Sequence, residues 1–129
     1  MIYGKNILSI QPADWTLNNA DMTSAVISLH ANGKATTEIK PTQLASIPST
    51  MLLSLIIDDY VDTYAPYAYA KLTIETSDSL YFEYTIPLVE IKNGMCTVEI
   101  TTTSTEYTSC FFTLVSTENI QIHSWSLNA

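Results

Sequence analysis

The stretch Leu80-Tyr-Phe-Glu-Tyr-Thr-Ile86 decides the fold class, because its side chains alternate in character along its length. One face carries four apolar or aromatic side chains, from Leu80, Phe82, Tyr84 and Ile86. The other face carries Tyr81, Glu83 and Thr85. A period of two residues is that of a β-strand with one buried face. The stretch therefore predicts a strand whose even-numbered side chains point into a core.

The segment just before this stretch predicts a partner strand. Ala70–Glu75 alternates in the same way, with Leu72 and Ile74 on the apolar face. Between the two segments, Thr76–Ser79 has the composition of a four-residue hairpin loop. The two strands are therefore expected to pair antiparallel as a β-hairpin.

Two Asn-Gly pairs predict further hairpins, because both central residues of a type I′ turn need a positive φ. At Asn93-Gly94, a two-residue loop would pair Ile91 with Cys96 and Val89 with Val98. Both pairs are apolar, so the register that the turn sets agrees with the hydrophobic pattern.

The second pair, Asn32-Gly33, predicts a hairpin that joins Ala25–His30 to Lys34–Ile39. In that register Ile27 would face Glu38, so a bulge or a longer loop is the alternative to a tight turn.

The remaining strands come from three more stretches: Met51–Ile57, Ser109–Val115 and Ile120–Leu127. Met51–Ile57 is apolar at both parities, which predicts a central strand covered on both faces. Pro41–Ser46 is expected to form a helical turn, with minimal helix elsewhere. The sequence thus predicts an all-β, two-sheet antiparallel sandwich of eight or nine strands, formed by one domain over residues 1–129.

Composition and charge exclude several classes of partner. The chain has 129 residues, 47% of them hydrophobic and 14% charged, which is typical of a folded domain. The net charge is −8, and all five basic residues are lysines scattered along the chain: Lys5, Lys34, Lys40, Lys71 and Lys92. Without arginine or a basic stripe, neither nucleic acid nor an anionic membrane is an expected partner. No apolar stretch reaches the roughly 18 residues of a membrane span, so none is predicted.

Three segments resemble the jelly-roll β-sandwich of carbohydrate-binding modules and galactose-binding-like domains. Lys5–Ser9 with Asp14–Thr16 is similar to the family's opening, and Ser49–Ile57 to the strand after the first hairpin. Phe111–Val115 with Glu118–Leu127 is similar to its two closing strands. The resemblance implies a jelly roll that binds a glycan. The family's Asp-rich closing strand, part of a calcium site, is here Ile122-His-Ser-Trp125, so the resemblance does not carry that site over.

Similar sandwiches recur in bacteriophage virion proteins. The start at Met1 without the regions of a signal peptide, and a composition rich in Thr, Ile, Asn and Tyr, are more like a phage structural protein than a secreted module. Our main hypothesis is therefore a non-enzymatic structural component of the virion, a capsid decoration, head fibre or tail module. It would form a homo-oligomer and assemble with other virion structural proteins. The alternative is a carbohydrate-binding module.

An aromatic, acidic stretch between two of the strands is the predicted binding or interface site. Its members are Tyr60, Tyr64, Tyr67 and Tyr69 with Asp58, Asp59 and Asp62. Tyrosine faces can stack on sugar rings or fill a protein interface, and the carboxylates can accept hydrogen bonds from sugar hydroxyls. The alternatives are a loop that caps the core and, for the aspartates, a solvated turn or a calcium site.

Catalytic and metal sites are not predicted, and neither is a cofactor. The only histidines, His30 and His123, are expected on strand surfaces, and no Gly-x-Ser-x-Gly or His-Glu-x-x-His motif is present. Three glutamates lie on predicted solvent faces: Glu75, Glu83 and Glu99. Cys96 and Cys110 are predicted to be buried free thiols. Trp15 and Trp125 are predicted to close the core, one with its N–H bonded at the rim.

Overall fold

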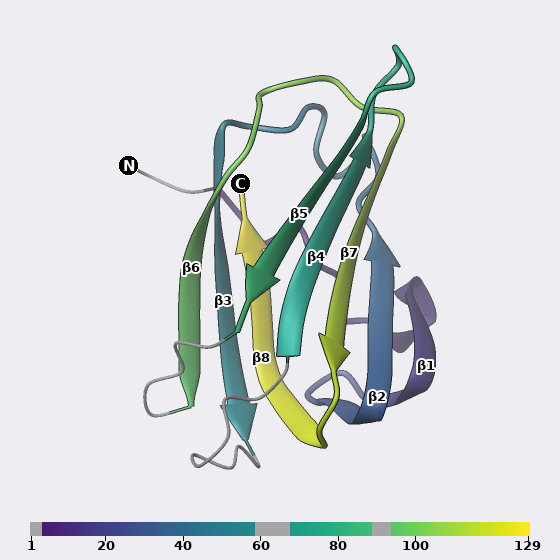
Figure 1. The fold of residues 1–129 in the computed structure, drawn as a ribbon, viewed down its shortest axis with the longest axis vertical. Coiled ribbons are helices and arrows are strands. Elements are labelled where there is room, and N and C mark those ends of the chain that lie inside the picture. Colours follow the sequence, from purple (N-terminus) through teal and green to yellow (C-terminus); the bar gives the residue numbers. More distant parts are fainter. Residues whose placement is uncertain (1–3, 59–67, 89–93) are drawn as a thin grey trace.

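The structure, a computed structural model, describes residues 4–58, 68–88 and 94–129. It contains one 3-10 helix, η1 (Pro12–Asp14), and eight strands (Figure 1). The strands are β1 (Trp15–Met22), β2 (Ile27–Glu38), β3 (Thr50–Asp58), β4 (Ala68–Glu75), β5 (Tyr81–Pro87), β6 (Met95–Thr101), β7 (Ser109–Ser116) and β8 (Ile120–Asn128). All of their pairings are antiparallel, which confirms the all-β class.

The strands follow the order β5-β4-β7-β2-β8-β3-β6, and β1 pairs with β2. The hydrogen-bonded sheet curves almost into a barrel, with β4, β5 and β7 in front of β3, β6 and β8 (Figure 1). Between the two layers lies a cluster of buried side chains that includes Phe112, Leu53 and Leu127. The predicted two-sheet sandwich is therefore confirmed.

One long strand belongs to both layers. The second half of β2, Gly33–Glu38, pairs with β7, whereas its first residues, Ile27–Leu29, pair with β8. Along its other edge β1 pairs with both halves, and the register shifts between Asn18 and Ala20. Asn19 and Asn32 have φ values of 52° and 62°, the left-handed region in which Asn is tolerated. This corner lets the sheet turn from one layer into the other.

The predicted hairpin at Asn32-Gly33 is wrong. Residues 27–38 form a single strand, and the Asn-Gly pair lies at the irregularity within it rather than in a turn. On the edge away from β7, Lys34–Thr37 pairs with Trp15–Asn18, from a strand that was not predicted. An Asn-Gly pair suits a bulge as well as a hairpin turn, because both need residues with a positive φ. Here the pairing of β1 with both halves of β2 favours the bulge.

The alternating stretch that opened the sequence analysis is confirmed as β5, paired with β4 in register. Ile86 is buried, Phe82 and Tyr84 are half-buried, and Leu80 is exposed just before the strand begins. Because β5 is the end of the strand order, its inward side chains are covered on one flank only. The hairpin loop runs from residue 76 to residue 80, one residue longer than the predicted Thr76–Ser79, and Leu80 N–H donates to the Thr76 hydroxyl (3.2 Å).

The prediction for Met51–Ile57 is half right. The segment is a strand between β8 and β6, and its odd-numbered side chains are buried. The opposite face is not covered, since Ile56 is 42% exposed. Apolar residues at both odd and even positions of this segment therefore do not indicate a strand that is buried on both faces.

The hairpin predicted at Asn93-Gly94 lies mostly outside the described residues, because Val89, Ile91 and Asn93 are among those not described. Gly94 has a φ of 77°, a conformation that suits glycine. On the described side, Cys96 and Val98 pair with Leu55 and Leu53 of β3.

Other predictions concern the ends of the sandwich. A turn occupies residues 41–43 of the predicted helical segment, closed by Leu44 N–H to the Lys40 carbonyl (3.0 Å). Cys96 and Cys110 are both buried and are not joined by a disulfide, as predicted. Trp15 and Trp125 are buried and contact each other edge to face, with ring centroids 6.5 Å apart. They close the core between the two ends of the chain.

Candidate functional site

The outer face of the layer formed by β5, β4, β7 and β2 carries an ordered array of side chains. Antiparallel register aligns outward residues of neighbouring strands into rows that run across the sheet. One row, the Phe111 row, consists of Glu38, Phe111, Thr73 and Glu83. The next, the threonine row, consists of Thr16, Thr36, Thr113, Lys71 and Thr85. An aromatic ring thus lies among hydroxyl and carboxylate groups.

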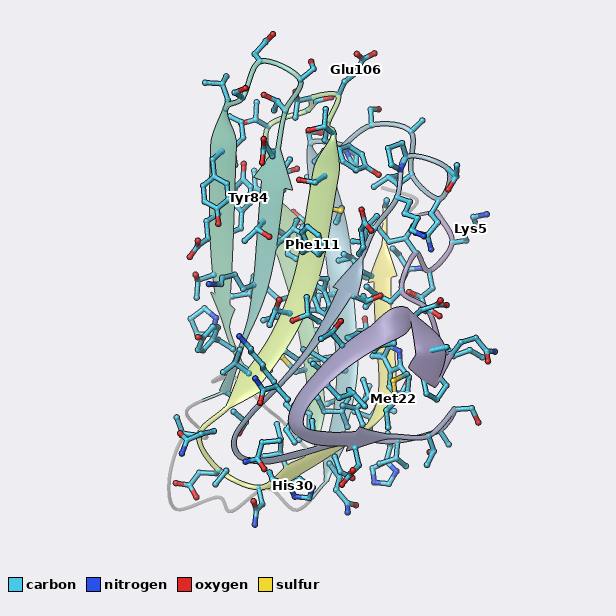
Figure 2. The ribbon with its side chains drawn as sticks, turned by 90° about the vertical axis from the view of Figure 1, so that its right-hand side faces the viewer. Lys5, Met22, His30, Tyr84, Glu106 and Phe111 are labelled. Carbon is cyan, nitrogen blue, oxygen red and sulfur yellow. The ribbon has the colours of Figure 1, made fainter. Side chains whose placement is uncertain are left out.

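Phe111 is the aromatic ring that this face presents near its centre (Figure 2). Its side chain is 40% exposed, although its neighbour Phe112 is completely buried. The alternation of β7 explains the difference, because successive side chains point to opposite faces. Beside it, the hydroxyl groups of Thr36 and Thr113 lie 3.1 Å apart. Phe111 therefore offers a flat apolar surface at a polar face.

A hollow of about 380 Å³, here called the Phe111 hollow, opens at one end of this face. The sheet contributes Thr16, Thr36, Glu38 and Phe111 to its walls. The opposite wall comes from η1 with Asp14, and from the turn region with Lys40 and Gln43. Its volume lies within the range of about 300–1,000 Å³ typical of small-molecule sites. The hollow combines one aromatic ring with carboxylate, amide, ammonium and hydroxyl groups.

Hydrogen bonds centred on Ser9 fix the wall that carries Asp14. The Ser9 hydroxyl donates to Oδ2 of Asp14 (2.6 Å) and accepts from Gln11 N–H (3.0 Å). The Ser9 carbonyl accepts the indole N–H groups of both Trp15 (2.9 Å) and Trp125 (3.0 Å). We predicted that one of the two indole N–H groups is hydrogen-bonded at the rim, and the structure shows that both are. The wall is tied directly to the core.

Charges on the far side of the face are paired with one another. Lys71 and Glu83 form an ion pair with 3.6 Å between nitrogen and oxygen. The Tyr81 hydroxyl donates to Glu83 (3.0 Å), and this hydrogen bond is the main cause that raises the pKa of Tyr81. A surface ion pair such as Lys71–Glu83 contributes little to the free energy of unfolding, on the order of 1 kcal/mol or less. These groups shape the rim of the face.

The histidines and glutamates lie where the sequence placed them. His30 Nε2 and Asp21 Oδ2 are 2.7 Å apart at the surface, and His123 is exposed at an irregularity of β8. Glu75, Glu83 and Glu99 are all exposed. Within residues 4–58, 68–88 and 94–129, no three His, Cys, Asp or Glu side chains gather as metal ligands would. Over the same residues, no helix has the length and apolar character needed to span a bilayer.

Most of the site predicted from sequence lies outside the described residues. These residues are Tyr60, Tyr64, Tyr67, Asp59 and Asp62. Of the others, Asp58 is the last residue of β3, and Tyr69 is a half-buried residue of β4 opposite Val115. The glycan or interface role of the tyrosine stretch stays a prediction.

The Phe111 hollow was not predicted from the sequence. The alternation of Ser109–Val115 does indicate one of its residues. If Cys110 and Phe112 point into the core, Phe111 must face outward. The other wall could not be found this way. Asp14, Lys40 and Gln43 come from separate irregular segments, and only the folded chain brings them together.

Comparisons with known proteins bear on this fold. Neither a family model nor a curated protein sequence matches the chain. Two solved structures are similar over nearly all of it. The CBM22-1 xylan-binding domain from Paenibacillus barcinonensis Xyn10C has a TM-score of 0.57 at 12% identity, over 99% of this chain and 96% of that one. The C-terminal family 22 carbohydrate binding module of Clostridium thermocellum Xyn10B has a TM-score of 0.51 at 14% identity, over 98% and 92%.

The fold is shared with carbohydrate-binding modules. It is also shared with part of the enzymatically active domain of bacteriophage CBA120 tailspike protein 4, with a TM-score of 0.53 at 13% identity. That match covers 95% of this chain but only 21% of the tailspike chain. At these identities the likeness concerns the fold, and function must be argued from the site.

Proposed function

We propose that this protein is a carbohydrate-binding module that holds its glycan in the Phe111 hollow. The observation that carries the proposal is the exposed Phe111 ring beside Glu38 and the threonine row, in a hollow of ligand size. An apolar ring face can cover the C–H face of a sugar, while carboxylate and amide oxygens accept hydrogen bonds from its hydroxyls. The fold shared with two family 22 modules, one of them xylan-binding by its description, supports the same class.

The rigidity of the hollow also supports a binding role. Asp14 is held by Ser9, whose carbonyl is fixed by two indole N–H groups. Lys40 N–H donates to Gln43 Oε1 (2.8 Å), which fixes the turn that completes the same wall. Walls that are ordered before binding lose little conformational entropy when a ligand arrives.

A glycan array that includes xylan fragments tests the proposal. The wild-type chain is expected to bind at least one glycan, and Phe111→Ala is expected to weaken that binding about tenfold or more, as at the centre of a binding site. An array without hits would remove the proposal.

The same array separates this hollow from the tyrosine stretch. If the Phe111 hollow is the site, Tyr64→Ala and Tyr67→Ala bind like the wild type while Phe111→Ala does not. The reverse pattern would move the glycan site to the stretch predicted from the sequence.

We further propose that the chain binds without catalysis. One carboxylate of the hollow, Asp14, already accepts a short hydrogen bond from Ser9 and serves to hold the wall. Each glycan that binds is expected to stay intact after prolonged incubation. The appearance of new reducing ends would contradict this part of the proposal.

A second candidate function is that of a structural module in a bacteriophage virion, in a homo-oligomer assembled with other virion proteins. Its support is the fold shared with a domain of a phage tailspike, together with the arginine-free composition. The two functions are compatible, since a virion module can bind a glycan. Mass spectrometry of purified particles and light scattering of the isolated chain test it. A monomer that no particle contains would exclude it.

A further inference from the structure

A second hollow lies beside the first. It has a volume of about 310 Å³ and is called here the Lys5 hollow. Three residues, Ser9, Asp14 and Gln43, line both it and the Phe111 hollow. Because the two hollows share these three residues, they lie side by side, and together they are called here the groove. Figure 2 places Phe111 near the centre of the face and Lys5 at its edge, which agrees with this course.

The two halves of the groove differ in chemistry. Among the described residues that line either hollow, Phe111 is the only one with an aromatic side chain. The Lys5 hollow offers the Lys5 ammonium group and the Thr42 hydroxyl, both from exposed residues. A sugar ring can therefore stack on an aromatic ring in the first half, whereas the second half offers hydrogen-bonding groups without an aromatic ring.

The wall of the Lys5 hollow is built into the fold through Asn6. Its Oδ1 accepts the backbone N–H groups of Leu8 (3.0 Å) and Leu127 (2.9 Å), and its Nδ2 donates to the Trp125 carbonyl (3.3 Å). These bonds occupy the Asn6 side chain and hold the N-terminal segment against β8. The segment thus forms a fixed wall, and Lys5 projects from it.

The formal charges along the groove cancel. Asp14 and Glu38 contribute two negative charges, and Lys5 and Lys40 contribute two positive charges. A strongly anionic or cationic chain would gain no net attraction from such a lining. An uncharged chain rich in hydroxyl groups suits it best, with donors and acceptors available along the whole length.

We propose that the groove binds a linear, uncharged oligosaccharide of at least two rings. One ring stacks on Phe111, and the chain passes Asp14 and Gln43 so that the next ring reaches Lys5 and Thr42. This proposal rests on the proposed function, and it adds the length, charge and course of the ligand.

Titration calorimetry of the whole chain tests the length. The probes are β-1,4-linked mono- to tetrasaccharides of glucose, xylose and mannose. In the series that binds, the Kd is expected to fall about tenfold or more from the monosaccharide to the trisaccharide, because the second half of the groove becomes occupied. A Kd that does not change with length, with binding still lost in Phe111→Ala, would overturn this inference and leave the proposed function standing. Failure of every probe and of the glycan array would overturn both.

Two variants of the second half sharpen the test. Lys5→Met and Thr42→Val each remove one hydrogen-bonding group and are expected to raise the Kd of the trisaccharide about three- to tenfold. The monosaccharide, held at Phe111, keeps its Kd in both variants. Lys34→Met is the matched control, because Lys34 is an exposed lysine that lines neither hollow. An equal loss in Lys34→Met would contradict the inference.

The charge of the ligand is tested with salt and with oligogalacturonate. The trisaccharide Kd is expected to stay within about twofold as NaCl is raised, since screening weakens only interactions between charges. Tighter binding of oligogalacturonate than of every uncharged probe would overturn the assignment of an uncharged chain.

Discussion

The two outer faces of the sandwich are built from strands of the same kind, and the Phe111 hollow opens beside one of them. The face of β5, β4, β7 and β2 presents Phe111 among threonines and glutamates. The face of β6, β3 and β8 presents serine and threonine with two exposed apolar side chains, Ile56 and Met95, which are direct cross-strand neighbours. Exposed apolar area is thus present on both faces and does not distinguish them.

The difference lies in what flanks each face. Beside Phe111, the helix η1 and the turn at residues 41–43 supply a polar wall, and the hollow forms between that wall and the sheet. The wall depends on the core behind it, since Trp15 from β1 and Trp125 from β8 both donate to Ser9. A sheet face becomes a site when irregular segments are fixed beside it, which is why loops on a rigid scaffold so often carry function.

The largest effect is expected from removing the support of that wall. Trp125→Ala deletes a buried ring that packs on Trp15 and is expected to lower the free energy of unfolding by about 3–5 kcal/mol. Trp125→Phe keeps most of the ring but loses the N–H donor, for a cost of about 1 kcal/mol. Urea unfolding followed by circular dichroism measures both. If both variants lost the same free energy of unfolding, the contributions of ring packing and of the hydrogen bond to Ser9 could not be separated.

The next effect concerns the corner that joins the two faces. A Cβ added at Gly33 would lie 2.3 Å from the carbonyl oxygen of Asn19 and 2.8 Å from that of His30. Backbone must shift to relieve such contacts, so Gly33→Ala is expected to destabilise the chain by about 1–3 kcal/mol. Thermal unfolding checks this. An unchanged melting temperature would mean that β1 and β2 are not packed so tightly at the corner.

One substitution on each face is expected to have a smaller effect on stability, and the two substitutions are expected to differ in their effect on glycan binding. Phe111→Ala and Ile56→Ala each remove a side chain that is 40% or 42% exposed, and each is expected to cost about 1 kcal/mol or less. Only Phe111→Ala is expected to weaken glycan binding. Parallel calorimetry of the two variants is the measurement, and equal losses of affinity would remove the distinction between the faces.

The smallest effect at neutral pH concerns a buried thiol behind the Phe111 face. Burial, and to a lesser degree the carboxylate of Glu38, raises the pKa of Cys110 from 9.0 to about 12. The folded state therefore keeps this proton while the unfolded state releases it. The resulting stabilisation is complete below pH 9 and is lost as the pH rises from 9 to about 12.

Two measurements check this prediction. In the native chain at pH 8 a thiol reagent is expected to leave Cys110 unmodified, whereas the unfolded chain reacts. The fall in stability above pH 9 is expected to be less steep in Cys110→Ala than in the wild type. Rapid modification of Cys110 under native conditions would contradict its burial.

The sequence predicted the strands that alternate strongly and misread those that do not. Leu80–Ile86 and Ala70–Glu75 became β5 and β4, with a loop one residue longer than predicted, because the inward side chains of the two strands must lie opposite one another. Trp15–Met22 was missed because its alternation breaks at Asn19, where the register shifts. That omission contributed to the error at Asn32-Gly33, because Lys34–Thr37 was paired with the segment just before it instead of with β1.

The sequence by itself determined the class of this protein: strands with inward apolar side chains, buried cysteines at positions 96 and 110, and two tryptophans that close the core. These follow from local patterns, in which each residue's neighbours along the chain fix its face. Only the tertiary structure decided that β2 runs through both layers, and that Ser9, Asp14, Gln43 and Phe111 line a common groove. Such a site joins residues about 100 positions apart in sequence, and strand pairing across the sandwich, which no local pattern encodes, brings them together.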